Sequence, residues 1–250
     1  ANELDSNVAL ISFLMCFGSF IQDESGALTI GSKNTVEAVQ FMADLYAQGS
    51  ESTVFGWKPE SNNQFLLAGR GSLIMNAISA VRRAEDLGMP IAKDLWMWPI
   101  PHGPRGRLAL GQYTSVYSIW KFAKNRAAAE KFVADLCIAS EQAILASNLF
   151  NFPTFPGAIA LKQIYGQAAA DAHPPRGKYS ILTTIASKHT RNVGYPGHAN
   201  AAVQEVLDTF LIPRMFAQVS QGRMSAADSV RATAQDLKRI WARQRAAGKI

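Results

Sequence analysis

The sequence predicts an α/β fold, because segments with the pattern of buried strands alternate with segments that have the period of a helix. Ser72–Met75 is a short apolar run, typical of a strand buried on both faces of a sheet. Gly111–Trp120 alternates toward β-branched and aromatic residues and indicates a second strand. Helical patterns precede and follow both runs, and the sequence has no internal repeat that would suggest a solenoid.

Three elements are expected in the first fifty residues. Val8–Phe17 is apolar almost throughout and predicts a buried helix. Phe20–Ile30 predicts two short strands around an acidic turn that contains glycine. Thr35–Gln48 carries an apolar stripe at helical spacing, and Ser32 or Asn34 can cap this helix.

The middle of the chain predicts further helices separated by a break. Helices are expected over Ser61–Ala68 and Ile78–Leu87, and prolines and glycines between Pro99 and Gly106 indicate a loop. Asn125 is a candidate cap for a helix that runs to Cys137. The residues of this helix expected to face inward are Ala128, Phe132, Val133 and Leu136.

The remainder of the chain reads mainly as helices, over residues 141–149, 158–170, 181–187, 199–218 and 226–245. A second break, rich in proline, separates the first two of these, at Phe152–Gly157. Pro213 is expected to bend or end the first part of its helix. Ser225, three residues before Asp228, resembles a capping box for the terminal helix.

The composition is that of an ordinary globular protein. The chain has 250 residues, of which 48% are hydrophobic and 18% are charged, and this excludes intrinsic disorder. The most apolar stretch, Val8–Phe20, covers about 13 residues against the ~20 that a membrane-spanning helix needs. Acidic Glu3 and Asp5 precede it rather than basic residues, so a buried helix is favoured over the core of an export signal.

The net charge of +6 is concentrated near the end of the chain. From Arg214 onward there are two acidic residues and eight basic ones, namely Arg214, Arg223, Arg231, Lys238, Arg239, Arg243, Arg245 and Lys249. A nucleic-acid-binding module that uses this terminal helix is therefore one alternative. A solvated helix face is the favoured interpretation, because the basic residues are not mixed with aromatic ones.

The sequence carries none of the common catalytic or metal-binding signatures. It has no Walker A motif, no complete dinucleotide fingerprint, no zincin motif and no nucleophile elbow. No cofactor and no metal are therefore expected, and an α/β enzyme of unknown reaction is kept as a second alternative. Cys16 and Cys137 allow either one disulfide or two free thiols.

Polar and aromatic residues do gather at the breaks between the expected elements. Aromatic faces can stack on the C–H faces of sugars, while amides and hydroxyls satisfy sugar hydroxyl groups. The candidate ligand-binding residues of this kind are Trp57, Asn76, Ser79, Gly111, Gln112, Tyr113, Phe152 and Tyr195.

Four segments, in this order, resemble the extracellular solute-binding proteins of ABC sugar importers, a family with the type II periplasmic-binding fold. They are residues 17–26 with the helix ending at Gly49, residues 62–76, residues 99–104 with Gly111 and residues 124–132, and residues 222–230. Together they cover nearly the whole chain.

The resemblance implies two α/β lobes that clamp a ligand between them. It places residues 1–110 and 152–250 in the helix-rich C-terminal lobe. Residues 111–151 form a hinge and a return segment of the N-terminal lobe. About the first third of a family member, including most of its N-terminal lobe, has no counterpart in this chain.

The resemblance further implies a function and partners. The chain is expected to be the substrate-binding component of a bacterial ABC importer, acting as a monomer in the periplasm or outside the cell. Its partners would be a carbohydrate ligand and the membrane permease, with no nucleic acid. A neutral sugar is favoured, because no cluster of Arg or Lys accompanies the candidate residues in sequence. Arg82 and Arg83 lie nearby in sequence, so an anionic sugar phosphate is kept as an alternative.

Overall fold

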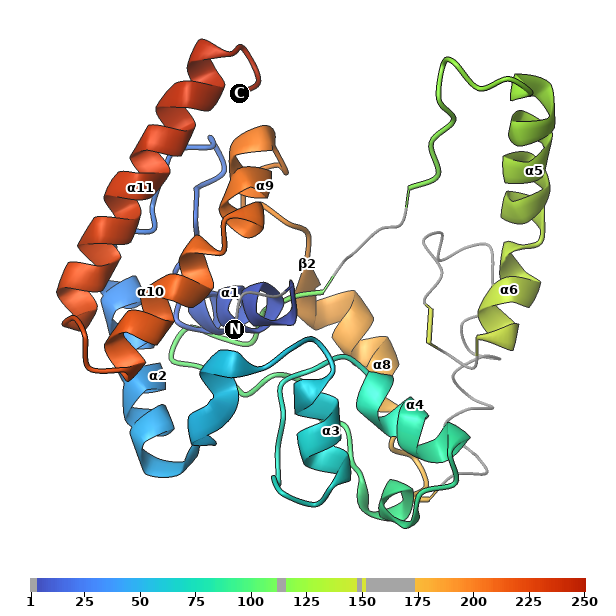
Figure 1. Cartoon of the computed structure of the whole chain (residues 1–250), viewed down its shortest axis with the longest axis horizontal. Helices are drawn as coiled ribbons and strands as arrows, with labels where there is room; N and C mark the ends of the chain where they lie inside the picture. The colour runs from blue at the N-terminus through green and yellow to red at the C-terminus, as the bar shows by residue number, and fades with distance from the viewer. Residues whose placement is uncertain (1–3, 112–115, 148–149, 152–173) are drawn as a thin grey trace. The chain divides into compact units, whose positions relative to one another are not determined.

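A computed structural model gives the structure of the chain and describes residues 4–111, 116–147, 150–151 and 174–250 (Figure 1). The chain forms two compact units. The core unit is built from Ala1–Ala77, Trp98–Gln112 and Thr184–Ile250, and the second unit from Ile78–Met97 and Tyr113–Thr183. Each unit is described by itself.

Helix α1 (Leu4–Cys16) forms the centre of the core unit and confirms the predicted buried helix. Its apolar residues pack against α2, α10 and the first strand. Two polar side chains within it form hydrogen bonds to backbone carbonyls. Asn7 donates to Leu207 O at 2.9 Å, and the Ser12 hydroxyl donates to Val8 O at 2.6 Å.

Four helices complete the core around α1. They are α2 (Lys33–Gly49), α9 (Ala201–Asp208), α10 (Leu211–Ser220) and α11 (Ala226–Ala246). In Figure 1, α10 lies between α11 and α1, and it contacts all four other helices. Ile212 of α10 and Leu237 of α11 are completely buried at this junction.

Side-chain caps set where these helices begin. Ser32 accepts from Thr35 N at the start of α2, and Ser225 accepts from Asp228 N at 3.1 Å at the start of α11. Both caps confirm the sequence prediction, since a hydroxyl satisfies an amide that has no partner within the helix. Asn200 caps α9 in the same way, accepting from Ala202 N and Val203 N.

The prediction that Pro213 breaks the helix expected over 199–218 is wrong. The break lies earlier, at Phe210, whose φ of 52° is left-handed. Pro213 sits in the first turn of α10, where its missing amide hydrogen costs no helical hydrogen bond. The chain therefore turns just before the proline and not at it.

Two short parallel strands form the sheet of the core unit. β1 (Ala109–Leu110) pairs with β2 (Thr190–Arg191), with Ala109 opposite Thr190 and Leu110 opposite Arg191. Leu110 N also donates to the Ser12 hydroxyl of α1 at 2.8 Å, so the pair is fixed to the central helix. Parallel pairing between segments this far apart in sequence is the signature of an α/β unit.

The strands expected from the sequence differ from those observed. Ser72–Met75 is not a strand, and Leu73 is 72% exposed, so the prediction of burial on both faces is wrong. The strand expected over Gly111–Trp120 is also wrong where the structure describes it, because residues 116–120 are irregular. Within residues 20–30 there is a single antiparallel bridge, Gln22 to Leu28, instead of two strands.

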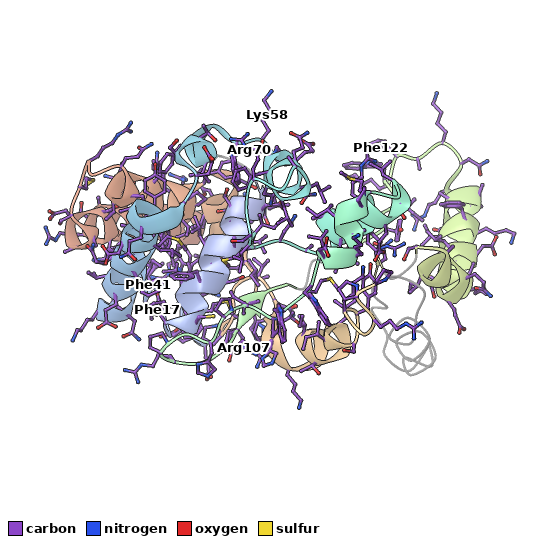
Figure 2. The ribbon with its side chains drawn as sticks, turned by 90° about the horizontal axis from the view of Figure 1, so that it is seen from below. Phe17, Phe41, Lys58, Arg70, Arg107 and Phe122 are labelled. Atoms are coloured by element: carbon purple, nitrogen blue, oxygen red, sulfur yellow. The ribbon has the colours of Figure 1, made fainter. Side chains whose placement is uncertain are left out.

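Two short helices and an aromatic cluster lie at the edge of the core unit. The helices are η1 (Ser52–Gly56) and α3 (Ser61–Leu67), and neither has a buried residue. Phe17 and Phe41 lie side by side in Figure 2, with ring centroids 5.7 Å apart, and Phe13 contacts both. Phe41 is half exposed, so it caps this end of the core.

The second unit contains short helices with little buried surface. They are α4 (Ser79–Asp86), η2 (Pro90–Asp94), α5 (Arg126–Ile138) and α6 (Ser140–Ala146). The chain then continues through α8 (Ile181–Thr184) and η3 (Ile185–His189) to β2. Asn125 caps α5 as predicted, accepting from Ala128 N at 3.2 Å.

The inward face predicted for α5 is not observed. No residue of this helix is buried, Ala128 is exposed, and Phe132 is 64% exposed. Val133 and Leu136 are only half-buried. The apolar spacing correctly predicts a helix, but nothing in the described part of the chain covers its apolar stripe.

Several sequence expectations stay predictions. The lobe boundaries at 110/111 and 151/152 are not tested by the two units, and the helix expected over 158–170 lies outside the described residues.

Cys16 and Cys137 are both free thiols, the first buried and the second exposed. Among the described residues, no helix combines the length and the apolarity needed to cross a membrane.

Replacement of Leu237 tests whether the α10–α11 junction carries the core. Leu237→Ala removes a completely buried side chain and leaves a cavity, so we expect a loss of about 2–5 kcal/mol in unfolding free energy. The neighbouring variant Lys238→Ala removes an exposed side chain and serves as the control. Urea titration followed by circular dichroism measures both, and equal midpoints would contradict the assignment of the core.

Candidate functional site

The carboxyl end of the β1–β2 pair positions two of the predicted site residues. Gly111 follows β1 directly, and its amide donates to Arg191 O of β2 at 3.3 Å. A side chain at Gly111 would place Cβ only 2.7 Å from Thr190 Cγ2, so the two segments approach closely because glycine is present. In α/β folds, ligands bind beyond the carboxyl ends of parallel strands, which is where Gly111 lies.

Tyr195 lies at the same end of the pair. Its ring meets Phe20 edge-on, with centroids 5.7 Å apart, and the Arg191 guanidinium carbon stands 5.2 Å from its centroid. Tyr195 is half-buried and packs against the core. Arg191 thus links Gly111 and Tyr195, which are 84 positions apart in the sequence. Its backbone oxygen accepts from the Gly111 amide, and its guanidinium group lies over the Tyr195 ring.

A buried amide, Gln22, fixes the loop that carries Tyr195. Gln22 Nε2 donates to Gly194 O and to His198 O, both at 2.8 Å. Its Oε1 accepts from Asn200 Nδ2 at 2.9 Å, and Asn200 in turn caps α9. Gly197 closes against this amide, since a Cβ there would lie 2.7 Å from Gln22 Nε2. Every donor and acceptor of the completely buried Gln22 amide is engaged in holding this loop.

The space behind Tyr195 is too small for a ligand. A cavity of about 20 Å³ lies between α1, Leu110 and the Tyr195 loop. That volume accommodates about one water molecule. A carbohydrate would therefore lie against the outer surface of this edge and not inside the core unit.

Trp57 and Asn76 occupy a separate part of the core unit, around α3. The Trp57 ring packs against Phe65, with centroids 5.2 Å apart, and its Nε1 donates to the Thr53 hydroxyl at 3.0 Å. Asn76 Nδ2 donates to Asn63 Oδ1. Both predicted residues thus contact α3, and Trp57 is half-buried whereas Asn76 is exposed.

The other predicted residues divide between the second unit and the undescribed segments. Ser79 is the first residue of α4 and belongs to the second unit. Gln112, Tyr113 and Phe152 lie outside the described residues. The structure brings Gly111 and Tyr195 together, and it joins Trp57 and Asn76 only through α3.

Sequence reasoning missed two residues that this geometry singles out. Gln22 lies in a polar stretch that reads as part of a turn, and no local pattern distinguishes an amide that pins a loop 170 residues away. Arg191 did leave a signal. No Asp or Glu occurs between Asp171 and Glu205, so an arginine in that stretch has no nearby carboxylate in sequence.

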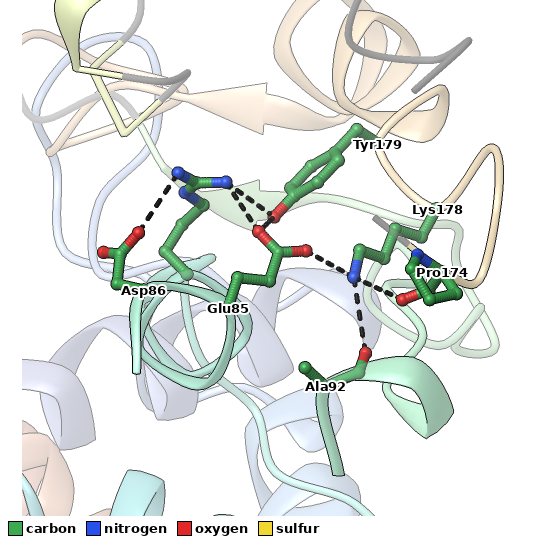
Figure 3. Close-up of polar contacts among 7 residues, drawn as sticks. Glu85, Asp86, Ala92, Pro174, Lys178 and Tyr179 are labelled. Atoms are coloured by element: carbon green, nitrogen blue, oxygen red, sulfur yellow. Dashed lines mark hydrogen bonds and ion pairs between the residues drawn. The ribbon is translucent and has the colours of Figure 1, made fainter. Parts of the chain in front are cut away.

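A second polar cluster lies within the second unit (Figure 3). Glu85 of α4 is its centre and accepts from Tyr179 Oη and from Arg82 Nη1, each at 2.6 Å. Lys178 forms an ion pair with the other Glu85 oxygen and donates to Pro174 O at 2.9 Å. Arg82 also reaches Asp86 at 3.4 Å.

This cluster is deeply buried and joins two chain segments. The side chains of Glu85 and Lys178 are each 1% exposed. Burial raises the pKa of the Tyr179 hydroxyl above its usual range, and the hydrogen bond to Glu85 acts in the same direction. The phenol therefore stays protonated as a donor. These contacts fix residues 174–179 to α4, so the cluster has a structural role within the second unit.

Comparison with solved structures identifies the architecture. A maltose-bound MalE3 from T. maritima superposes with a TM-score of 0.62 at 20% identity, over 93% of this chain and 56% of its own. A sugar transporter from Arthrobacter chlorophenolicus A6 with bound laminaribiose gives 0.69 at 19% identity, over 93% and 56%. The fold is that of a periplasmic solute-binding protein. This confirms the α/β, type II periplasmic-binding fold class expected from the sequence.

A third similar structure comes from Synechococcus sp. MITs9220, a protein assigned as an oligosaccharide periplasmic-binding protein and solved with zinc. Its TM-score is 0.63 at 16% identity, over 97% of this chain and 60% of its own. The chain thus spans little more than half the length of the proteins it resembles. No protein-family model and no curated protein sequence matches it.

The donor set of the described residues does not suggest a metal site. Among them, no group of three or more His, Cys, Asp or Glu side chains is placed to hold an ion.

Replacement of Gln22 tests the support of the Tyr195 loop. Gln22→Met keeps the volume but removes three hydrogen bonds, to Gly194 O, His198 O and Asn200 Nδ2, so we expect a loss of about 2 kcal/mol in unfolding free energy. Gln40→Met, on the exposed side of α2, should leave the stability unchanged. Urea titration compares the two, and equal losses would show that the amide does not hold the loop.

Replacement of Lys178 tests the buried cluster. Lys178→Met leaves the Glu85 carboxylate in a buried position without its ammonium partner, which costs about 3–5 kcal/mol. Lys131→Met removes one member of an exposed ion pair on α5 and should change little. Hydrogen exchange should show faster opening of residues 174–182 only in Lys178→Met, and unchanged exchange there would contradict the role of the cluster.

Proposed function

We propose that this chain is part of the substrate-binding component of a bacterial ABC importer and that it binds a carbohydrate non-covalently. The observation that carries the proposal is the convergence of Gly111, Arg191 and Tyr195 at the carboxyl ends of the two parallel strands. The fold supports it, because the similar solved structures include proteins with bound maltose and laminaribiose.

The chemistry of this edge suits a sugar. Tyr195 supplies an aromatic surface at the edge of the core. Gly111 allows its segment to approach Thr190 closely, which places the end of β1 beside Arg191. Trp57 and Asn76 provide a further ring and an amide in the same unit. In this proposal Ser79, Gln112, Tyr113 and Phe152 complete the ligand contacts, as the sequence predicts.

The remaining parts of the proposal concern lobes, location and partners. We assign residues 1–110 and 152–250 to one lobe and residues 111–151 to a hinge and a second lobe. The uncovered apolar stripe of α5, with Phe132 exposed, supports packing of that segment in a lobe of its own. The protein would act as a monomer in the periplasm or outside the cell and deliver its ligand to a membrane permease.

A ligand panel tests the proposed function. Thermal melts of the chain with mono- and disaccharides and sugar alcohols should show a raised midpoint for one sugar class. A ligand at a hundredfold excess over its Kd stabilises the folded state by about 2.7 kcal/mol. Tyr195→Ala should abolish this shift, because it removes the ring at the strand ends.

The control variant is Tyr46→Ala, which removes a ring that packs against Phe55 on α2 and η1. It should lower the midpoint without ligand but keep the ligand-induced shift. A shift that survives Tyr195→Ala would move the site elsewhere on the molecule. A panel that stabilises neither the parent chain nor Tyr46→Ala would refute carbohydrate binding.

A further inference from the structure

Arg191 carries a positive charge that nothing in the described part of the chain neutralises. Its Nη1 donates to Thr190 O at 2.8 Å and to Lys188 O at 3.2 Å. These carbonyls orient the guanidinium group but carry no formal charge. No carboxylate lies within ion-pair distance of Arg191 among the described residues, although the side chain is half-buried.

The other arginines with comparable surroundings are treated differently. Buried Arg82 pairs with Glu85 and Asp86. Arg70 stands over the Phe65 ring, 5.3 Å from its centroid, much as Arg191 stands over Tyr195, yet it has Glu51 at 3.6 Å. Half-buried Arg107 also has no carboxylate partner among the described residues, but it lies near Cys16, the last residue of α1, where the helix dipole favours a cation. Arg191 combines an aromatic face with no counter-charge.

The surrounding sequence explains why no counter-charge is present. The two segments joined by the β1–β2 pair contain no Asp or Glu over residues 95–129 and 172–204. The nearby turn does contain Asp23, but its carboxylate already accepts from Ser25 N, Ser25 Oγ and Ala27 N. The strand ends therefore keep a net positive charge.

We infer that Arg191 is the recognition residue for an anionic group, so that the ligand is a carbohydrate bearing a carboxylate or a phosphate. This inference rests on the proposed function and replaces the neutral sugar that the sequence favoured. A partly buried charge without a partner is costly, and a ligand anion would supply the missing counter-charge. The planar guanidinium matches the geometry of carboxylate and phosphate oxygens.

The geometry leaves Arg191 free to act in this way. Among the residues that the structure describes, only Nη1 has hydrogen-bond partners, so Nε and Nη2 are available as donors on the guanidinium edge. Contact with the Tyr195 ring and the two carbonyls holds the group in one orientation before a ligand arrives.

Calorimetric titration of the chain with matched sugars tests the inference. The probes are D-glucose, D-glucuronate and D-glucose 6-phosphate, together with D-galactose and D-galacturonate. We expect an acidic member to bind at least about tenfold more tightly than its neutral parent, because hydrogen bonds to charged groups are the stronger ones. Comparing the carboxylate with the phosphate identifies the anionic group, and its binding should weaken as sodium chloride is raised.

Two variants and a control assign the effect to one residue. Arg191→Gln should remove the preference for the acidic sugar, and Arg191→Lys should retain part of it, because an ammonium keeps the charge but loses the planar fork. Lys238→Gln removes the same charge from the exposed face of α11 and should bind like the parent chain. Circular dichroism checks that each variant is folded.

The outcomes separate this inference from the proposed function. Equal binding of neutral and acidic sugars, unchanged in Arg191→Gln, overturns the inference and leaves carbohydrate binding in place. A preference for acidic sugars that Lys238→Gln loses as fully as Arg191→Gln also overturns it, because it would reflect overall charge. Binding of a neutral sugar from the wider panel, with no binding of any acidic sugar, also overturns the inference and leaves carbohydrate binding in place.

Discussion

The arrangement at the strand ends depends on one buried amide. Gln22 has two donors and an acceptor, and all of them serve the loop that joins β2 to α9. An apolar residue of the same size would fill the space but would lose the hydrogen bonds to Gly194 O, His198 O and the Asn200 amide. Because Asn200 also caps α9, the same amide fixes Tyr195 on one side and the start of a core helix on the other. The position of Tyr195 is therefore set by the interior of the protein.

The β1–β2 pair adds the second half of this arrangement. A parallel pair of two residues per strand has few hydrogen bonds of its own, so its stability comes from what it packs on. Leu110 is buried against α1, and its amide reaches the Ser12 hydroxyl of that helix. The pair brings Gly111 beside Arg191 and, through Arg191, beside Tyr195. The position of the candidate site therefore depends on the packing of α1, since a shift of α1 would displace β1 with it.

The sequence correctly predicts the features that depend on neighbouring residues, namely helices and their caps. It does not predict the features that depend on distant residues, namely strand pairing and burial. Helical spacing and local caps such as Ser32, Asn125 and Ser225 correctly located most helices. Strand prediction failed at Ser72–Met75 and over the described residues 116–120, because an extended segment becomes a strand only where a partner lies alongside it. The predicted burial of Phe132 failed for a similar reason. An apolar stripe shows which face of a helix can be buried, but it does not show whether another described segment covers that face. Tyr195 and Gly111 could be named from their loops, but their meeting through Arg191 required the pairing of β1 with β2.

The distribution of charge distinguishes the structural groups from the group available for recognition. On α10 and α11, four of the basic side chains, Arg214, Arg231, Arg239 and Arg243, each have a carboxylate partner. In the second unit, Glu85 forms ion pairs with Arg82 and Lys178 and accepts a hydrogen bond from Tyr179, so each charge in this cluster has a partner of opposite sign. Arg191 follows neither pattern, because it is partly withdrawn from water and held in place by neutral groups. Arg191 is a cation without a counter-charge in the described part of the chain. An anion bound beside it would therefore gain more Coulomb energy than it would from a cation in bulk solvent.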